Sequence, residues 1–396
     1  MAIEGALKGI RVLDLTNVLS GPYACYLLGL MGAEVIKVER PGTGDFARQL
    51  GADPDLNARG FGVSFLAQNA GKRSVSLNLK HPEGAALFKR LVERADVVVE
   101  NNRPGVMERL GLSYEVLRGV NPHLIHCAIS GFGQTGPMRD DPAYDQIVQG
   151  IAGVMALTGD QQSAPLRVGY PMADTIAGLM AAFSIASALN ANPRGAFLDV
   201  AMTEAVLSTM GWAVSNFLIA GQVPGTLGNE NPATAPSGTF QTADAPINIA
   251  ANRDDHWQAL VRHLRREELL THPDYATRED RKRNRHALRA ALEEALTTRP
   301  AAAWVEELNR LGIPSGPVLS VPETLASEQI EGRGLLSRHT SAVGEIAVVA
   351  SPVVVDGTRP AAESPPPPLG ADNASVYGEL GLDTAEIERL TAEGVL

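Results

Sequence analysis

The sequence predicts an α/β fold in two parts: a large Rossmann-like domain on a mostly parallel sheet, and a smaller α+β domain. Strand and helix patterns alternate through the first two hundred residues, which is typical of a parallel sheet covered by helices. After about residue 222 the chain becomes rich in turns and charged helices. A chain of 396 residues, 44% hydrophobic, can bury one large core and a second, smaller one.

The strands of the large domain are short and rich in Val and Ile. They are expected at Ile10–Leu15, Ala33–Glu39, Ser74–Leu79, Asp96–Glu100 and His123–Ser130. Helical spacing is found at Tyr23–Leu30 and His81–Arg94, and a long apolar run from Ala177 to Ala191 predicts a buried helix. The order strand, helix, strand favours a parallel sheet with helices on both faces.

The smaller domain begins with a turn-rich passage, Leu227–Pro236, followed by a hairpin pattern over Ser237–Ala251. Its helices are expected at Asp254–Leu264, Asp280–Leu296 and Ala301–Leu311. Strand-like sequence returns at Gly344–Val355, and an extended proline segment, Pro365–Pro368, leads to a last helix at Thr384–Glu393. We therefore expect a large domain over residues 1–205, a small one over 225–322, and a C-terminal return to the large domain over 328–396.

Composition excludes several classes of function. A net charge of −11 and a pI near 5.3 argue against a nucleic-acid surface. Cys25 and Cys127 form neither a disulfide framework nor a metal-spaced set, so we expect two core thiols and no metal. Met1–Lys8 lacks the pattern of a secretion signal, and Met172–Leu189, the most membrane-like stretch, contains Asp174. The prediction is a cytoplasmic protein without a membrane partner.

The lysines are concentrated near the N-terminus. Five of the six lie in the first ninety residues, at positions 8, 37, 72, 80 and 89. Such a positive region suits a ligand that carries several phosphates, and it suits a solvated surface equally well. The loop after the first strand, Thr16–Pro22, lacks the glycines of a dinucleotide fingerprint, which argues against NAD or FAD.

Asp174 is the most informative residue. It is a lone carboxylate at the start of the apolar run, in or just before the first helical turn. Backbone amides and the helix dipole favour the ionised form at that place. Helix capping is the structural alternative for an isolated aspartate there.

A series of motifs resembles the family III CoA-transferases, the group that includes formyl-CoA:oxalate transferase and α-methylacyl-CoA racemase. The series runs in order through Leu7–Asp14 with Gly21-Pro22, Gly32–Glu39, Lys72-Arg73-Ser74, Leu77–Lys80, Asp96–Gly105 and Gly312–Val318. The resemblance covers nearly the whole chain. It implies an interlocked homodimer with active sites between the large domain of one subunit and the small domain of the other.

The resemblance also implies a mechanism. Asp174 matches the catalytic aspartate of the family, a nucleophile that forms an anhydride with the acyl group and then a thioester with CoA. No cofactor is bound, because the coenzyme A thioester is itself a substrate, together with a carboxylic acid. Positioning has to supply much of the rate, since carboxylates are weak nucleophiles.

Further positions match the CoA contacts of the family. The implied CoA-binding residues are Asn17, Val18, Leu19, Ser20, Arg40, Leu77, Lys80, Asn101, Asn102, Arg103, Arg109, Tyr144 and Asp145. Arginine forks suit phosphate oxygens, and lysine acts as a point charge. For Asp145, helix capping is the alternative interpretation.

Tyr144 separates two branches of the family. The racemases carry a histidine there, and a tyrosine with an ordinary pKa near 10 replaces it poorly as a base. The prediction is a transferase, with an α-methylacyl-CoA racemase or epimerase as the alternative.

Several departures bear on specificity. The glycine run of formyl-CoA:oxalate transferases is missing between Thr226 and Gln241, which favours short dicarboxylates with succinyl-CoA or acetyl-CoA as donor. Related chains often have a histidine where Asn231 or Asn373 stands. Arg48, Arg73 and Arg167 are candidates to bind a distal carboxylate, with a structural role as the alternative for each. Leu227–Pro232 is a candidate lid with a domain linker as its alternative.

Overall fold

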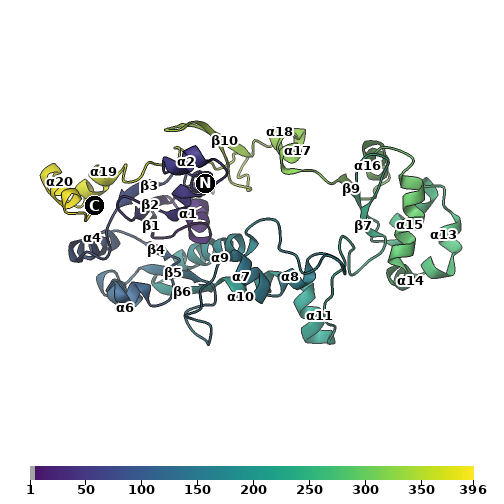
Figure 1. Cartoon of the computed structure of the whole chain (residues 1–396), viewed down its shortest axis with the longest axis horizontal. Helices are drawn as coiled ribbons and strands as arrows, with labels where there is room; N and C mark the ends of the chain where they lie inside the picture. Colours follow the sequence, from purple (N-terminus) through teal and green to yellow (C-terminus); the bar gives the residue numbers. More distant parts are fainter. Residues whose placement is uncertain (1–4) are drawn as a thin grey trace. The chain divides into compact units, whose positions relative to one another are not determined.

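The computed structural model describes residues 5–396 and divides them into two compact units (Figure 1). The first unit runs to Val154 and continues with Arg167–Gly221 and Glu331–Leu396; the second comprises Met155–Leu166 and Gln222–Ile330. The first four residues of Met1–Lys8, on which the location prediction partly rests, lie outside the described residues.

The first unit contains a six-stranded sheet in which every pairing is parallel. Its order is β3-β2-β1-β4-β5-β6, with strands β1 (Arg11–Asp14), β2 (Glu34–Glu39), β3 (Arg73–Ser76), β4 (Val97–Glu100), β5 (Ile125–Ser130) and β6 (Ala196–Ala201). The strand order reverses between β1 and β4, as in doubly wound folds. The predicted α/β class and parallel sheet are confirmed.

Helices cover both faces of this sheet and enclose two apolar cores. One core packs α4 (Pro82–Val92), α6 (Tyr114–Val120), α19 (Asn373–Glu379) and α20 (Thr384–Ala392) on the sheet. The other packs α1 (Ser20–Leu30), α7 (Asp145–Ile151), α9 (Met172–Leu189) and α10 (Met202–Thr209). Cys25 and Cys127 are free and buried in this second core, as the sequence predicts.

Shorter elements complete the first unit. They are η1 (Phe46–Gln49), α2 (Pro54–Ala58), α3 (Val63–Leu66), α5 (Val106–Arg109), α11 (Trp212–Ala220) and the hairpin β10 (Leu336–Ser341) with β11 (Gly344–Val349). The strand expected at Gly344–Val355 therefore ends at Val349 and pairs within this hairpin. Helix α8 (Val154–Leu157) starts at Val154 and has its other three residues in the second unit.

The second unit is an antiparallel sheet packed with helices. Strands β7 (Ser237–Phe240), β8 (Ile247–Ala250) and β9 (Ser315–Pro317) form the sheet. The helices are α12 (Asp254–His263), α13 (Glu268–Thr271), η2 (Pro273–Tyr275), α14 (Arg278–Arg283), α15 (Arg285–Leu296), α16 (Ala301–Arg310), α17 (Val321–Leu325) and α18 (Glu328–Gly332). Its core is built on Trp257, Leu292 and Trp304, with Leu260 and Leu308 between them.

Helix α9 owes its position to small residues. An added Cβ on Gly178 would lie 2.6 Å from the Ser20 carbonyl oxygen and 3.0 Å from the Tyr23 ring, so only glycine lets α9 approach the start of α1 so closely. By length and composition α9 could cross a membrane, yet Ala177, Ala181 and their neighbours on one face lie in the core. Asp174, one turn before Gly178, is thereby brought close enough to Ser20 for a hydrogen bond between their side chains.

Candidate active site

The predicted contact residues lie at the carboxyl edge of the sheet, where open α/β sheets bind ligands. The loops after β1 and β4, which flank the reversal of strand order, are joined by a reciprocal pair of hydrogen bonds. Asn17 donates its N–H to Asn101 Oδ1, and Asn101 Nδ2 donates to the Asn17 carbonyl, each at 2.8 Å. Asn101 Nδ2 also lies 3.4 Å from Ser20 Oγ. One asparagine therefore fixes the whole turn into α1.

A cluster of buried charged side chains stabilises the same turn, Asn17–Ser20. Asp14 accepts from the Thr16 N–H and hydroxyl at 3.0 and 2.5 Å, and its other oxygen pairs with Lys72 at 2.8 Å. Lys37 donates to the Thr16 carbonyl and pairs with Asp45, both at 2.9 Å. Burial alone would raise the pKa of Asp14, but the charges of Lys37 and Lys72 lower it to about 2.

This cluster corrects the interpretation of the lysines. Lys37 is completely buried and Lys72 is 4% exposed, so neither contributes to a positive surface for phosphates. Of the N-terminal lysines, Lys8 and Lys80 are the exposed ones. The error has a plain physical cause: a lysine in a strand pattern cannot be told from a surface lysine until its carboxylate partners are placed around it.

Val18 has a backbone conformation that β-branched residues avoid, with φ at +67°. Its N–H donates to Asp45 Oδ1 at 2.9 Å, and the same oxygen accepts the Ala47 N–H at 2.8 Å. The strained turn is thus held by a carboxylate that is itself anchored on Lys37. Strain maintained in this way is concentrated at functional sites.

Asp174 lines a cavity of about 210 Å³ in the first unit. The loops after β1, β4 and β5 and the segment before α7 surround it. Its lining comprises Asn17, Val18, Ser20, Asn101, Asn102, Arg103, Pro104, Ile129, Ser130, Gly131, Arg139, Asp141, Ala143, Tyr144, Asp174 and Met202. The cavity thus brings the predicted nucleophile together with seven of the predicted CoA contacts.

A second cavity of about 250 Å³ adjoins the first, since Asn17 and Asn102 line both. Arg40, Leu77 and Lys80 line it, together with Leu15, Val38 and Leu79. An apolar floor with one arginine and one lysine at its rim suits a purine base and its phosphates. The two cavities therefore lie side by side, with Asp174 in one and Arg40 and Lys80 in the other.

The ionisation of Asp174 differs from the prediction. Desolvation by burial, together with the charge of Asp145, raises its pKa to about 7, and the Ser20 hydroxyl opposes this only in part. The helix amides do not keep Asp174 ionised, because Asp145 occupies them: Asp145 Oδ1 accepts the N–H groups of Ala173 at 2.8 Å and Asp174 at 3.4 Å. Asp174 is therefore not a helix cap.

Three predicted contact residues do not line either cavity. Leu19 directly precedes α1, Arg109 is exposed at the end of α5, and the Asp145 carboxylate points to α9 instead. In turn, Arg139 and Asp141 line the Asp174 cavity and were missed. In the sequence, the one feature that could have pointed to these two residues is their position in the loop after the predicted strand His123–Ser130, between Gly131 and Tyr144.

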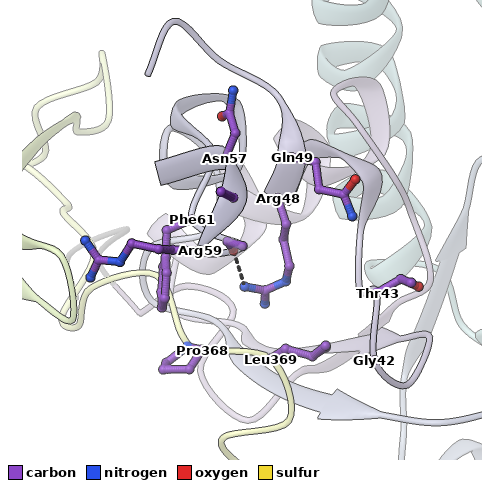
Figure 2. Close-up of a pocket in the computed structure, with 11 residues that line it drawn as sticks. Gly42, Thr43, Arg48, Gln49, Asn57, Arg59, Phe61, Pro368 and Leu369 are labelled. Atoms are coloured by element: carbon purple, nitrogen blue, oxygen red, sulfur yellow. Dashed lines mark hydrogen bonds between the residues drawn. The ribbon is translucent and has the colours of Figure 1, made fainter. Parts of the chain in front are cut away.

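The arginines considered as binders of a distal carboxylate all have internal partners, which favours the structural alternative for them. Arg73 pairs with Glu34 and Glu379, and Arg167 lies 3.7 Å from Asp145. Arg48 makes two hydrogen bonds of 2.7 Å to Glu39 and lines a separate cavity of about 700 Å³, where it also reaches the Gly60 carbonyl (Figure 2). Arg48 and Arg73 are thus closely paired within the fold, whereas Arg167 makes one longer contact and keeps an exposed side chain.

The positions that depart from related chains are structural as well. Asn373 accepts the Ser76 N–H at 2.9 Å and donates to the Ser76 hydroxyl at 2.8 Å, which joins the C-terminal segment to β3. Asn231 caps the Ala233 N–H at 2.8 Å. The candidate lid Leu227–Pro232 is a closed turn in the second unit, and its Glu230 is buried and paired with Arg289.

The parallel sheet and the reversed strand order define a doubly wound α/β protein, with two adjoining cavities at the carboxyl edge of the sheet and a partly buried aspartate in one of them. The chain belongs to CoA-transferase family III, whose model matches residues 7–373. It is an enzyme of that class, which uses CoA thioesters and carboxylic acids as substrates.

Relatives and solved structures agree with this assignment. The acetyl-CoA:oxalate CoA-transferase of Acetobacter aceti is 40% identical over 97% of this chain and 98% of its own length. The succinate–glutarate CoA-transferase of Agrobacterium fabrum is 36% identical over 94% and 95%. An alanine mutant of Rv3272 from Mycobacterium tuberculosis matches with a TM-score of 0.84 at 31% identity, covering 94% of this chain and 98% of that one. A CaiB/BaiF family protein from Brucella suis matches with 0.82 at 32%, covering 94% and 99%.

Proposed function

We propose that this enzyme transfers CoA from an acyl-CoA donor, succinyl-CoA or acetyl-CoA, to a small carboxylic or dicarboxylic acid through intermediates on Asp174. One observation supports this most directly: a carboxylate with a pKa of about 7 lines a cavity that adjoins a nucleotide-sized one. At neutral pH a large share of such a carboxylate is ionised, and its raised basicity makes it a better nucleophile than an ordinary aspartate.

The reaction consists of four acyl exchanges. An Asp174 oxygen attacks the thioester carbonyl of the donor, the C–S bond breaks, and an aspartyl anhydride and CoA thiolate result. The thiolate attacks the aspartyl carbonyl, which gives an aspartyl-CoA thioester and releases the donor acid. The acceptor carboxylate then attacks that thioester, and the freed thiolate attacks the acceptor carbonyl of the new anhydride. Asp174 is regenerated, and no net proton transfer is needed.

The surrounding residues have distinct roles in this scheme. Arg40, Leu77 and Lys80 bind the adenine and phosphate end, and the turn Asn17–Ser20 with Asn101, Asn102 and Arg103 guides the pantetheine arm. Ser20, which hydrogen-bonds Asp174, orients the attacking oxygen. Burial of the carboxylate keeps water from an anhydride that hydrolyses readily.

We further propose that the working form is an interlocked homodimer. Among the described residues, none of α11 is buried, although its sequence is almost wholly apolar. Trp212, Leu218 and Ile219 are 73%, 73% and 86% exposed. A helix of this kind needs an apolar partner, and a second copy of the chain would supply one. The cytoplasmic location and the domain boundaries also stay predictions.

A trapping experiment tests the mechanism. The purified enzyme is incubated with succinyl-, acetyl- or formyl-CoA and a panel of acids, and both products and intact protein are followed by mass spectrometry. Hydroxylamine should convert Asp174 to a hydroxamate only after acyl-CoA has been added. Without such an adduct during turnover, the covalent scheme is wrong. Deuterium uptake at the α-carbon without an acceptor acid would instead indicate the racemase alternative.

A further inference from the structure

Asp145 has an unusual place next to the nucleophile. It is the first residue of α7, 7% exposed, and its two carboxylate oxygens have different partners. Oδ1 accepts the amides of Ala173 and Asp174 at 2.8 and 3.4 Å. These are the second and third residues of α9, whose own N-cap, Pro171, offers no side-chain hydrogen bond. Asp145 therefore caps α9 from another helix.

The other oxygen anchors this cap. Oδ2 accepts from Gln149 Nε2 at 2.7 Å and lies 3.7 Å from Arg167 Nε. Gln149 is completely buried, accepts the Val168 N–H at 2.9 Å and donates to the Tyr170 carbonyl at 3.3 Å. The segment that leads into α9 is thus bound to α7 at several points, and a carboxylate held so firmly cannot leave α9 to follow a substrate.

We propose that Asp145 is a positioning residue for the nucleophile: its carboxylate fixes the start of α9 and occupies the amides there, so that the Asp174 carboxylate is left free to attack. This inference rests on the proposed function of Asp174. An aspartate at the third position of a helix would otherwise be drawn to those same amides. Bound to them, its oxygens would be poorer nucleophiles.

Electrostatics agrees with this geometry. The Asp145 charge is, after desolvation, the second cause that raises the pKa of Asp174. Other groups near the pair are Arg167 beside Asp145, Ser20 and Tyr23 on α1, and Arg103, Arg139, Asp141 and Tyr144 in the cavity. A change in the charge of Asp145 acts on Asp174 directly, since Oδ1 lies 3.4 Å from the Asp174 backbone nitrogen.

Two substitutions separate positioning from a contact with CoA. Asp145→Ala removes the cap, and we expect kcat to fall about 100-fold while KM for acyl-CoA stays unchanged, because small misplacements of a nucleophile have effects of that size. Asp145→Asn keeps an oxygen for the amides but removes the charge. We expect it to retain much of kcat and to move the acid limb of the kcat/KM profile to lower pH, since the pKa of Asp174 falls.

Asp96→Asn is the matched control, because Asp96 also accepts a backbone amide, that of Arg11 at 2.9 Å, and lines neither cavity. It should change stability alone. The inference is overturned if Asp145→Ala keeps wild-type kcat, if it raises only KM for acyl-CoA, or if the Asp145→Asn profile does not move. Should Asp145→Ala not fold, Asp145→Asn decides. Turnover in Asp174→Ala would instead overturn the proposed function itself.

Discussion

Asp14 and Asp174 are two aspartates of the same unit, the first buried and the second partly buried, and the charges around them are opposite. Asp14 has two lysines within 4 Å and the N–H and hydroxyl of Thr16 as donors. Asp174 has one hydroxyl donor, from Ser20, and a second carboxylate near it. The first has its pKa lowered to about 2 and the second has its pKa raised to about 7.

The opposite pKa shifts of Asp14 and Asp174 indicate different roles, a structural one for Asp14 and a reactive one for Asp174. A carboxylate that is paired with fixed cations stabilises the neighbouring turn, and its oxygens are already occupied by these donors. A carboxylate without a nearby cation has its ionised form destabilised in the folded state, and a reaction that removes the charge relieves this destabilisation. The cluster around Asp14 therefore holds the turn Asn17–Ser20 in place, while Asp174 is the carboxylate that we propose to react.

The largest expected effect concerns Asp174. Asp174→Asn should lower kcat by roughly 10⁴-fold or more, because a positioned nucleophile is worth an effective molarity of about 10⁵ M. Binding of CoA, measured by calorimetry, should persist, since the cavity lined by Arg40 and Lys80 is untouched. Asp141→Asn, in the same cavity, is the control for a mere loss of charge. If Asp174→Asn transfers CoA at the normal rate, Asp174 is not the nucleophile.

The next effect concerns the compensated cluster. Lys37→Met leaves Asp14 and Asp45 without a shared cation in the core, and we expect the free energy of unfolding to fall by about 3–5 kcal/mol. Urea unfolding measures it, with the exposed Lys8→Met as control. If the free energy of unfolding falls less in Lys37→Met than in the control, Lys37 does not stabilise the cluster.

The pH dependence of stability has opposite signs in the two regions. For Asp14, whose folded pKa lies below 3.8, stability is present above pH 4 and lost as the pH falls towards 2. For Asp174, whose folded pKa is above 3.8, the folded state loses stability as the pH rises from about 4 to 7. Asp174→Asn should therefore be more stable than the wild type at pH 8, by about 1–3 kcal/mol, and equal to it at pH 4. A variant that is less stable at pH 8 would contradict the raised pKa.

Much of this arrangement could be predicted from the sequence, and the failures have a common cause. The strand and helix patterns predicted the sheet, and the motifs predicted Asp174 and the residues around it. Burial and pairing could not be predicted, because they depend on which distant side chains meet. For Lys37, Lys72 and Arg48 the sequence leaves more than one role open, because each meets its carboxylate only in the folded chain. Arg139 was missed since nothing local distinguishes it from other loop arginines.

Arg139 provides the smallest and most specific test. It lines the Asp174 cavity and uses Nε for the Gln134 carbonyl and Nη1 for exposed Asp140, whereas no hydrogen bond among the described residues uses its Nη2. We expect this nitrogen to bind the distal carboxylate of a dicarboxylic acceptor. Arg139→Gln should then raise KM for a dicarboxylate about tenfold, the worth of one charge-assisted hydrogen bond, and leave KM for a monocarboxylate unchanged. Arg73→Gln, whose guanidinium pairs with Glu34 and Glu379, should change neither. Equal effects on both acids would show that Arg139 supports the cavity wall and does not select the acceptor.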